Sequence, residues 1–156
     1  ENLTAEVEKL QPDVILIDTD SPSRDTLEHL AAMNKNMPRP VVIFTQEDGQ
    51  ATIRDAVKAG VSAYIVDGLD PRRIKPIVEV ARARFEDTQA LRRELDEISQ
   101  KLSDRKLVDK AKGVLMKARG IDEDAAYHAM RKLAMERGQT MAKVARDVID
   151  MARVLL

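Results

Sequence analysis

Two polar side chains in the first half of the chain follow short apolar runs, at points where chemistry could occur. Asp18 follows the run 14–17, and Thr45 follows the run 41–44. If these runs form neighbouring parallel strands, their carboxyl ends meet at the edge where open α/β sheets bind ligands. Asp18 would then be reachable by solvent, and Thr45 could donate its hydroxyl to an anion held at Asp18. A carboxylate that ends a strand more often has a structural role, so both interpretations stay open.

In the second half, three lysines and a glycine share one face of a predicted helix. At about 100° per residue, Lys106, Lys110, Gly113 and Lys117 fall within one narrow stripe. An ordinary solvated face usually interleaves acids for i,i+4 pairing, and this stripe contains none. Glycine inside a helix costs about 1 kcal/mol relative to alanine, so a packed helix or an approaching nucleic-acid backbone should need the missing side chain of Gly113.

The positive charge extends beyond this stripe. Arg131 and Lys132 lie on or near the polar side of the next predicted helix, and Lys112 lies off the stripe. Residues 104–156 carry twelve basic and eight acidic side chains, whereas residues 1–69 carry six basic and twelve acidic ones. This asymmetry indicates two modules with different partners, because clustered Lys and Arg attract phosphate.

The elements expected to position Asp18 and Thr45 alternate between strand and helix. Three β-branched runs are separated by helical stretches, which predicts a doubly wound parallel sheet with helices on both faces. Three strands in about 70 residues would bury little surface, so we expect an N-terminal strand–helix–strand piece to be missing. The expected strands are 14–17, 41–44 and 63–66, and the expected helices are 3–10, 26–33 and 51–59.

A long helix is predicted from Asp70, with Pro71 in its first turn and a kink or delayed start at Pro76. Four apolar residues then follow 4-3-4 spacing, which is typical of a short coiled-coil seam and predicts a homodimer. Packing of the same helix on its own domain is the alternative. The seam residues are Leu91, Leu95, Ile98 and Leu102.

After this seam the apolar spacing changes and predicts a small bundle of three amphipathic helices. Asp122 is expected to cap the middle helix, Gly138 to end it and Thr140 to cap the last one. A second apolar face appears on the first helix at Leu107, Val108, Ala111, Val114, Leu115 and Ala118. The other two helices have apolar faces at Ala126, Met130, Leu133 and Ala134, and at Met141, Val144, Ala145, Val148 and Ala152.

Composition excludes several classes of function. The chain has no cysteine, its four aromatic residues are too scattered for stacking platforms, and its apolar runs are too short to span a bilayer. His29 and His128 have no second ligand at a metal spacing, so no metal site is expected. The absence of a signal-like start suits a cytoplasmic protein. We expect a protein without catalytic residues, and not an enzyme.

The first half resembles the receiver domain of bacterial response regulators over residues 1 to about 85, through its element order and Asp18, Pro22, Thr45 and Tyr64. The resemblance implies that the residue matching Asp18 accepts a phosphoryl group and the residue matching Thr45 contacts it. It also implies that the backbone carbonyl of the residue matching Asp20 binds Mg²⁺.

Two features depart from that family. Its Mg²⁺-binding acidic pair lies on a first strand that this chain lacks, and Asp67 stands where receivers carry a lysine after the last strand. A second acid disfavours a phosphoryl group at a site that works by charge neutralisation. Mg²⁺ is therefore implied only if Asp18 is phosphorylated, and no other cofactor is expected.

The second half resembles the ANTAR domain, an RNA-binding three-helix module of bacterial transcription antiterminators. The resemblance rests on the run Ala111–Met116 and on the spacing to Ala125-Ala126, Leu133–Met135 and Val144-Ala145. It also implies RNA contact by Lys112, which helix geometry places off the lysine stripe, so both interpretations of Lys112 stay open. The implied domains are a receiver-like domain at 1–85, a coiled-coil linker at 86–103 and an ANTAR domain at 104–156.

The run Gly60–Gly68 further resembles the nitrate-assimilation, NasT-like branch, which tolerates an acid in place of the receiver lysine. This implies binding to paired hairpins of a leader transcript and a nitrate-sensing, NasS-like partner protein. A DNA-binding two-component response regulator is the alternative, but its recognition helix would need base-reading side chains, and residues 141–145 offer one lysine. A protein-only adaptor would show no salt-dependent affinity for nucleic acid.

Overall fold

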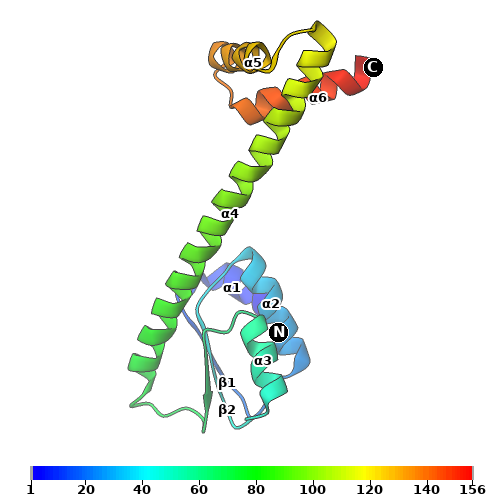
Figure 1. Cartoon of the computed structure of the whole chain (residues 1–156). Helices are drawn as coiled ribbons and strands as arrows, with labels where there is room; N and C mark the ends of the chain where they lie inside the picture. The colour runs from blue at the N-terminus through cyan, green and yellow to red at the C-terminus, as the bar shows by residue number, and fades with distance from the viewer. Residues whose placement is uncertain (1, 156) are drawn as a thin grey trace. The chain divides into compact units, whose positions relative to one another are not determined.

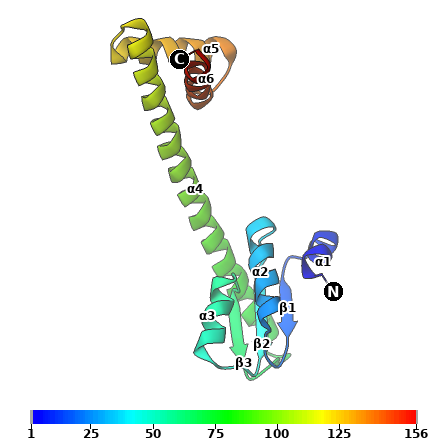
Figure 2. The same ribbon diagram turned by 90° about the vertical axis from the view of Figure 1, so that its right-hand side faces the viewer.

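The computed structural model describes residues 2–155, which divide into one compact unit up to Leu91 and a second from Arg92. The first unit is an α/β domain, and the second contains helices (Figures 1 and 2). The elements are α1 (Leu3–Leu10), β1 (Ile15–Asp18), α2 (Arg24–Asn36), β2 (Val41–Thr45), α3 (Gln50–Lys58), β3 (Ala63–Val66), α4 (Ile74–Arg119), α5 (Glu123–Arg137) and α6 (Met141–Leu155).

The three strands form one parallel sheet in the order β1-β2-β3 (Figure 2). Asp18 pairs with Phe44 in register, and Thr45 pairs with Val66, so the carboxyl ends of the strands meet at one edge as predicted. All five residues of the central strand β2 are buried. The sequence therefore predicted the strand positions to within one residue at each end.

Side chains of β2 alternate between two cores, one on each face of the sheet. Val41 and Ile43 belong to a cluster with α1, α2 and α3, whereas Val42 and Phe44 pack with Ala81 of α4. The alternation follows from the two-residue period of a strand. It confirms the expectation that helices cover both faces, and it explains why the β2 run is apolar throughout.

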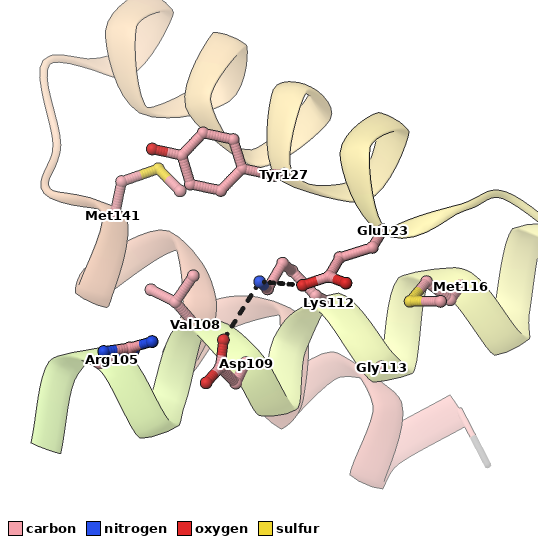
Figure 3. Close-up of a pocket in the computed structure, with 9 residues that line it drawn as sticks. All are labelled: Arg105, Val108, Asp109, Lys112, Gly113, Met116, Glu123, Tyr127 and Met141. Atoms are coloured by element: carbon pink, nitrogen blue, oxygen red, sulfur yellow. Dashed lines mark hydrogen bonds and ion pairs between the residues drawn. The ribbon is translucent and has the colours of Figure 1, made fainter. Parts of the chain in front are cut away.

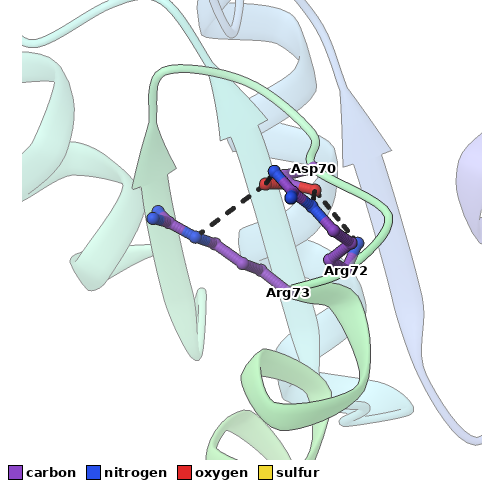
Figure 4. Close-up of polar contacts among 3 residues, drawn as sticks. All are labelled: Asp70, Arg72 and Arg73. Carbon is purple, nitrogen blue, oxygen red and sulfur yellow. Dashed lines mark hydrogen bonds and ion pairs between the residues drawn. The ribbon is translucent and has the colours of Figure 1, made fainter.

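The start of α4 is delayed, as Pro76 suggested, and Pro71 lies before the helix and not in its first turn as predicted. Residues 71–73 form turns before the helix begins at Ile74, and Pro76 occupies the first turn, where a backbone N–H has no intrahelical acceptor. Asp70 organises these turns because its carboxylate accepts a hydrogen bond from the Arg72 backbone N–H at 3.0 Å and contacts the Arg72 and Arg73 side chains (Figure 4).

The Arg72 side chain and backbone N–H hold the pKa of Asp70 below its usual range. Because folding lowers this pKa, the Asp70 contacts stabilise the folded state at pH values above the ordinary aspartate pKa. This contribution is lost as the pH falls through the lower, folded-state pKa. The α4 helix then continues without a break for 46 residues.

The second unit has the predicted three-helix core, to which the C-terminal part of α4 contributes Ala111. Both predicted caps of α5 are present, since the Asp122 side chain accepts from the Ala125 N–H at 2.8 Å and Gly138 adopts a left-handed φ of 61°. Thr140 accepts from the Lys143 N–H at 3.2 Å. The buried residues of this core are Ala111, Met130, Ala134, Val144, Ala145 and Ile149, of which the sequence analysis missed Ile149.

Met130 should be the most sensitive large side chain of this small core. It is 1% exposed, whereas Met135 of the same helix is 74% exposed. Met130→Ala should lower the free energy of unfolding by about 2–5 kcal/mol, because it leaves a cavity. Met135→Ala, the matched control, should change it by less than about 0.5 kcal/mol. Urea denaturation of the full chain measures both, and equal effects would contradict this description of the core.

Candidate nucleic-acid interface

The predicted lysine stripe is a solvent-exposed surface of α4. Lys106, Lys110 and Lys117 are all exposed. None of their side chains takes part in an ion pair or hydrogen bond within residues 2–155. Their three charges are therefore available to an anionic partner, as the sequence pattern indicated.

Gly113 lies on the same surface with open space beside it. A Cβ atom built at this position meets no atom within 4 Å in the described chain. Of the two reasons that the sequence gave for this glycine, packing of a helix of the same chain is therefore absent. The described residues therefore leave the surface at Gly113 open.

A groove of about 590 Å³ opens beside Gly113, between α4 and the first turns of α5 and α6 (Figure 3). Its wall combines polar groups with an exposed aromatic ring, that of Tyr127. Sequence analysis missed this groove, because it depends on how the loop 120–122 returns α5 across α4. The lining residues are Arg105, Val108, Asp109, Lys112, Gly113, Met116, Glu123, Tyr127 and Met141.

Lys112 points into this groove and is engaged by two carboxylates, unlike the three stripe lysines (Figure 3). Its Nζ lies 3.1 Å from Asp109 Oδ1 and 2.8 Å from Glu123 Oε1, and its side chain is only 14% exposed. The hydrogen bond to Glu123, and then that to Asp109, raises the pKa of Lys112. The structure thus places Lys112 off the stripe, as helix geometry predicted.

Arg131 and Lys132 are exposed on α5, outside the groove beside Gly113. Lys132 borders a second, more apolar groove of about 630 Å³, which also involves Arg119 and Glu136. Neither Arg131 nor Lys132 forms an ion pair in the part of the chain that the structure describes. They add positive charge to the second unit, but they lie on α5 and not on the lysine stripe of α4.

The predicted seam residues are exposed on α4 and have no apolar cover within residues 2–155. Leu91, Leu95, Ile98 and Leu102 are 62%, 65%, 57% and 54% exposed. Within the unit from Arg92 onward, neither α5 nor α6 covers Leu95, Ile98 or Leu102. A row of large apolar side chains this exposed indicates an interaction surface.

At the sheet edge, Asp18 is exposed, but Thr45 is 1% exposed and already paired. The Thr45 hydroxyl donates to the Asp20 carbonyl at 2.8 Å and accepts from the Glu47 N–H at 3.1 Å. The Asp20 carbonyl also accepts from the Gln46 N–H. In this structure the Thr45 hydroxyl therefore donates its proton to the loop after β1 and not to an anion at Asp18. The Asp20 carbonyl oxygen already accepts two hydrogen bonds, from Thr45 and Gln46.

The same edge holds two features that the sequence did not predict. The Tyr64 hydroxyl donates to the Glu47 carbonyl at 2.8 Å, and burial raises the pKa of Tyr64. Asp67, directly after β3, adopts a left-handed φ of 78°, which is unusual for a residue with a side chain. The Tyr64 hydrogen bond ties β3 to the loop after β2, and the Asp67 conformation turns the chain after β3. Neither residue supplies a cation near Asp18.

Residues 2–155 contain neither a candidate metal cluster nor a helix suited to a bilayer. No group of three or more His, Asp or Glu side chains could hold a metal ion. No helix combines the length and the apolar content that crossing a bilayer requires.

Comparisons with known proteins agree with this architecture. The ANTAR domain family matches residues 96–149. The transcriptional regulatory protein PdtaR of Mycobacterium tuberculosis (strain ATCC 25618 / H37Rv) is 32% identical over 140 residues, which cover 90% of this chain and 68% of PdtaR. The nitrate regulatory protein of Klebsiella oxytoca is 35% identical over 83 residues, 53% of this chain and 21% of that protein.

A solved structure, that of a DNA-binding response regulator of the LuxR family from Staphylococcus aureus, has 26% sequence identity and a TM-score of 0.40. It covers 53% of this chain and 67% of that chain.

A receiver-like α/β domain followed by a helical ANTAR domain defines a transcriptional regulator of the response-regulator type. The chain belongs to the ANTAR-domain family of transcriptional regulatory proteins.

The ion pairs of Lys112 predict an alkaline titration. Lys112 should lose its proton above the ordinary lysine range, and Glu123→Gln should return its pKa toward that range. Because folding raises this pKa, the stabilising contribution is present at neutral pH and is lost as the pH rises through the folded-state value. NMR titration of the lysine side-chain carbons measures both effects. A Lys112 pKa that does not respond to Glu123→Gln would contradict the observed contact.

Proposed function

We propose that the chain binds hairpins of leader mRNA through its C-terminal unit and acts as a transcription antiterminator. The observation that carries this proposal is the stripe of Lys106, Lys110 and Lys117, exposed and unpaired beside the open surface of Gly113. Unpaired lysines bind phosphates by displacing condensed counterions, and a missing side chain lets a backbone approach closely. The ANTAR match supports RNA as the nucleic acid.

A DNA-binding response regulator is the second candidate, and α6 does not favour it. A recognition helix presents base-reading side chains in its first turns. The first turn of α6 offers Lys143, whose Nζ lies 2.9 Å from Asp147 Oδ1 on the same helix. That lysine is partly neutralised, and the side chains of Met141 and Ala142 beside it have no group that donates or accepts a hydrogen bond at base edges in the way of Arg, Asn or Gln.

We further propose that the chain acts as a homodimer through Leu91, Leu95, Ile98 and Leu102. The exposure of these side chains supports a partner helix of the same sequence, because 4-3-4 spacing suits a two-stranded coiled coil. Two ANTAR bundles held together could grip two hairpins at once. Linkage of this kind raises affinity by roughly 10²–10⁴ without new contacts.

Regulation is assigned to a protein partner of the acidic first unit and not to phosphorylation of Asp18. The acid at Asp67 and the occupied Thr45 hydroxyl support this, because neither would stabilise a phosphoryl group. Mg²⁺ would be needed only if Asp18 were phosphorylated. The similarity to a nitrate regulatory protein favours genes of nitrate or nitrite assimilation and a nitrate-sensing, NasS-like partner. This function requires no catalytic residue.

The lysine stripe predicts how binding should depend on salt. Alanine at Lys106, Lys110 or Lys117 should weaken binding to a two-hairpin leader RNA and lower the slope of log affinity against log salt by about 0.7 per lysine. Filter binding at several salt concentrations measures the slope, with duplex DNA of equal charge as the competitor. Unchanged slopes in all three variants would mean that the stripe is only solvated, and preference for the duplex would overturn the RNA proposal.

The seam predicts a difference between two RNAs. The double variant Leu95→Gln, Ile98→Gln should lose much more affinity for a paired-hairpin RNA than for one isolated hairpin, because it removes the dimer and leaves the stripe intact. Glu94→Gln with Glu97→Gln, off the seam on the same helix, and Asp18→Asn should both bind like the wild type. Equal losses on the two RNAs would contradict the bivalent arrangement.

A further inference from the structure

Lys112 immediately precedes Gly113, but its charge is already used within the chain. Its ammonium contacts Asp109 at 3.1 Å and Glu123 at 2.8 Å, while those two acids remain 58% and 69% exposed. An approaching phosphate would therefore meet two carboxylates around one mostly buried cation. Such a cluster is a poor phosphate ligand, unlike the free ammonium groups of the stripe.

The two ion pairs connect different helices. Asp109 lies one turn before Lys112 on α4, whereas Glu123 is the first residue of α5, beyond the loop in which Gly120 adopts a left-handed φ of 64°. Lys112 thus ties the start of α5 to α4 across this loop. Tyr127 follows Glu123 by one helical turn, and it forms the opposite wall of the groove beside Gly113 (Figure 3).

We propose that Lys112 is a positioning residue for RNA binding, which holds the start of α5 against α4 and so sets the width of the groove beside Gly113. Phosphate contact is made by Lys106, Lys110 and Lys117. This assignment rests on the proposed function and deepens it, because it separates the lysines that meet RNA from the one that shapes the surface.

Neutralising Glu123 distinguishes positioning from direct contact by the sign of its effect. If Lys112 met phosphate, Glu123→Gln would release its ammonium, remove a negative charge and tighten RNA binding. As a positioning residue, Lys112 loses its tie to α5, so Glu123→Gln should weaken binding by about three- to tenfold. Asp124→Asn is the matched control: it removes the same charge one residue later, where no ion pair exists within residues 2–155, and should tighten binding slightly.

The salt slope gives a second readout. Lys112→Met should weaken binding about tenfold with the slope unchanged, whereas Lys110→Ala should lower the slope by about 0.7. Lys112→Arg should bind like the wild type, because it can still reach both carboxylates. Helical circular dichroism and thermal unfolding check that each variant folds. Hydrogen exchange at residues 123–127 should rise in Glu123→Gln and Lys112→Met even without RNA.

The outcomes separate this inference from the proposed function. If the wild type binds the hairpin RNA and Glu123→Gln binds it more tightly, or if Lys112→Met lowers the salt slope, Lys112 contacts RNA directly and the inference is wrong. Unchanged hydrogen exchange at residues 123–127 in both variants also overturns it. If the wild type shows no salt-dependent affinity for the RNA, the proposed function fails and the positioning role fails with it.

Discussion

The helical period of α4 is the constraint on which the C-terminal unit depends. At about 3.6 residues per turn, one helix presents its residues on separate faces, and each face here has a different neighbour. Ala111 is buried against α5 and α6, whereas Leu102, at the end of the exposed apolar row, is followed at four-residue steps by the exposed Lys106 and Lys110. An insertion of one residue between 102 and 111 would rotate the core face by about 100° relative to the row and misplace both.

The same period explains where the apolar row ends. Continued at steps of four and three, the seam positions after Leu102 are Arg105, Asp109, Lys112 and Met116. These are groove residues, and Lys112 among them is paired with Glu123 of α5. From Lys112 onward the first turn of α5 therefore lies where a second long helix would otherwise pack. A coiled coil through Leu102 is compatible with this arrangement, because the next three seam positions, Arg105, Asp109 and Lys112, carry charged side chains.

The sequence predicted the features that follow from local periodicity. The three strands, the caps of α5 and the buried row around Ala111 and Met130 each depend on residues close together in the chain. It did not predict the contact of Thr45 with Asp20 or that of Lys112 with Glu123, whose partners are 25 and 11 residues apart in sequence. Such contacts depend on the path of a loop, and periodicity carries no information about it. The groove beside Gly113 was missed for the same reason, although the open stripe itself was predicted.

Lys112 illustrates why residue type and family resemblance leave a role undecided. Lys110, Lys112 and Lys117 are identical in chemistry and close in sequence, yet only Lys112 has carboxylates at 2.8 and 3.1 Å. The two carboxylates hold the Lys112 ammonium in a fixed position. They also cancel its positive field beyond a few ångströms, so Lys112 does not attract distant anions. The unpaired lysines keep their field and their mobility, which suits them to attract an anion. Rigid placement of the groove and attraction of its ligand are thus divided between residues on two faces of one helix.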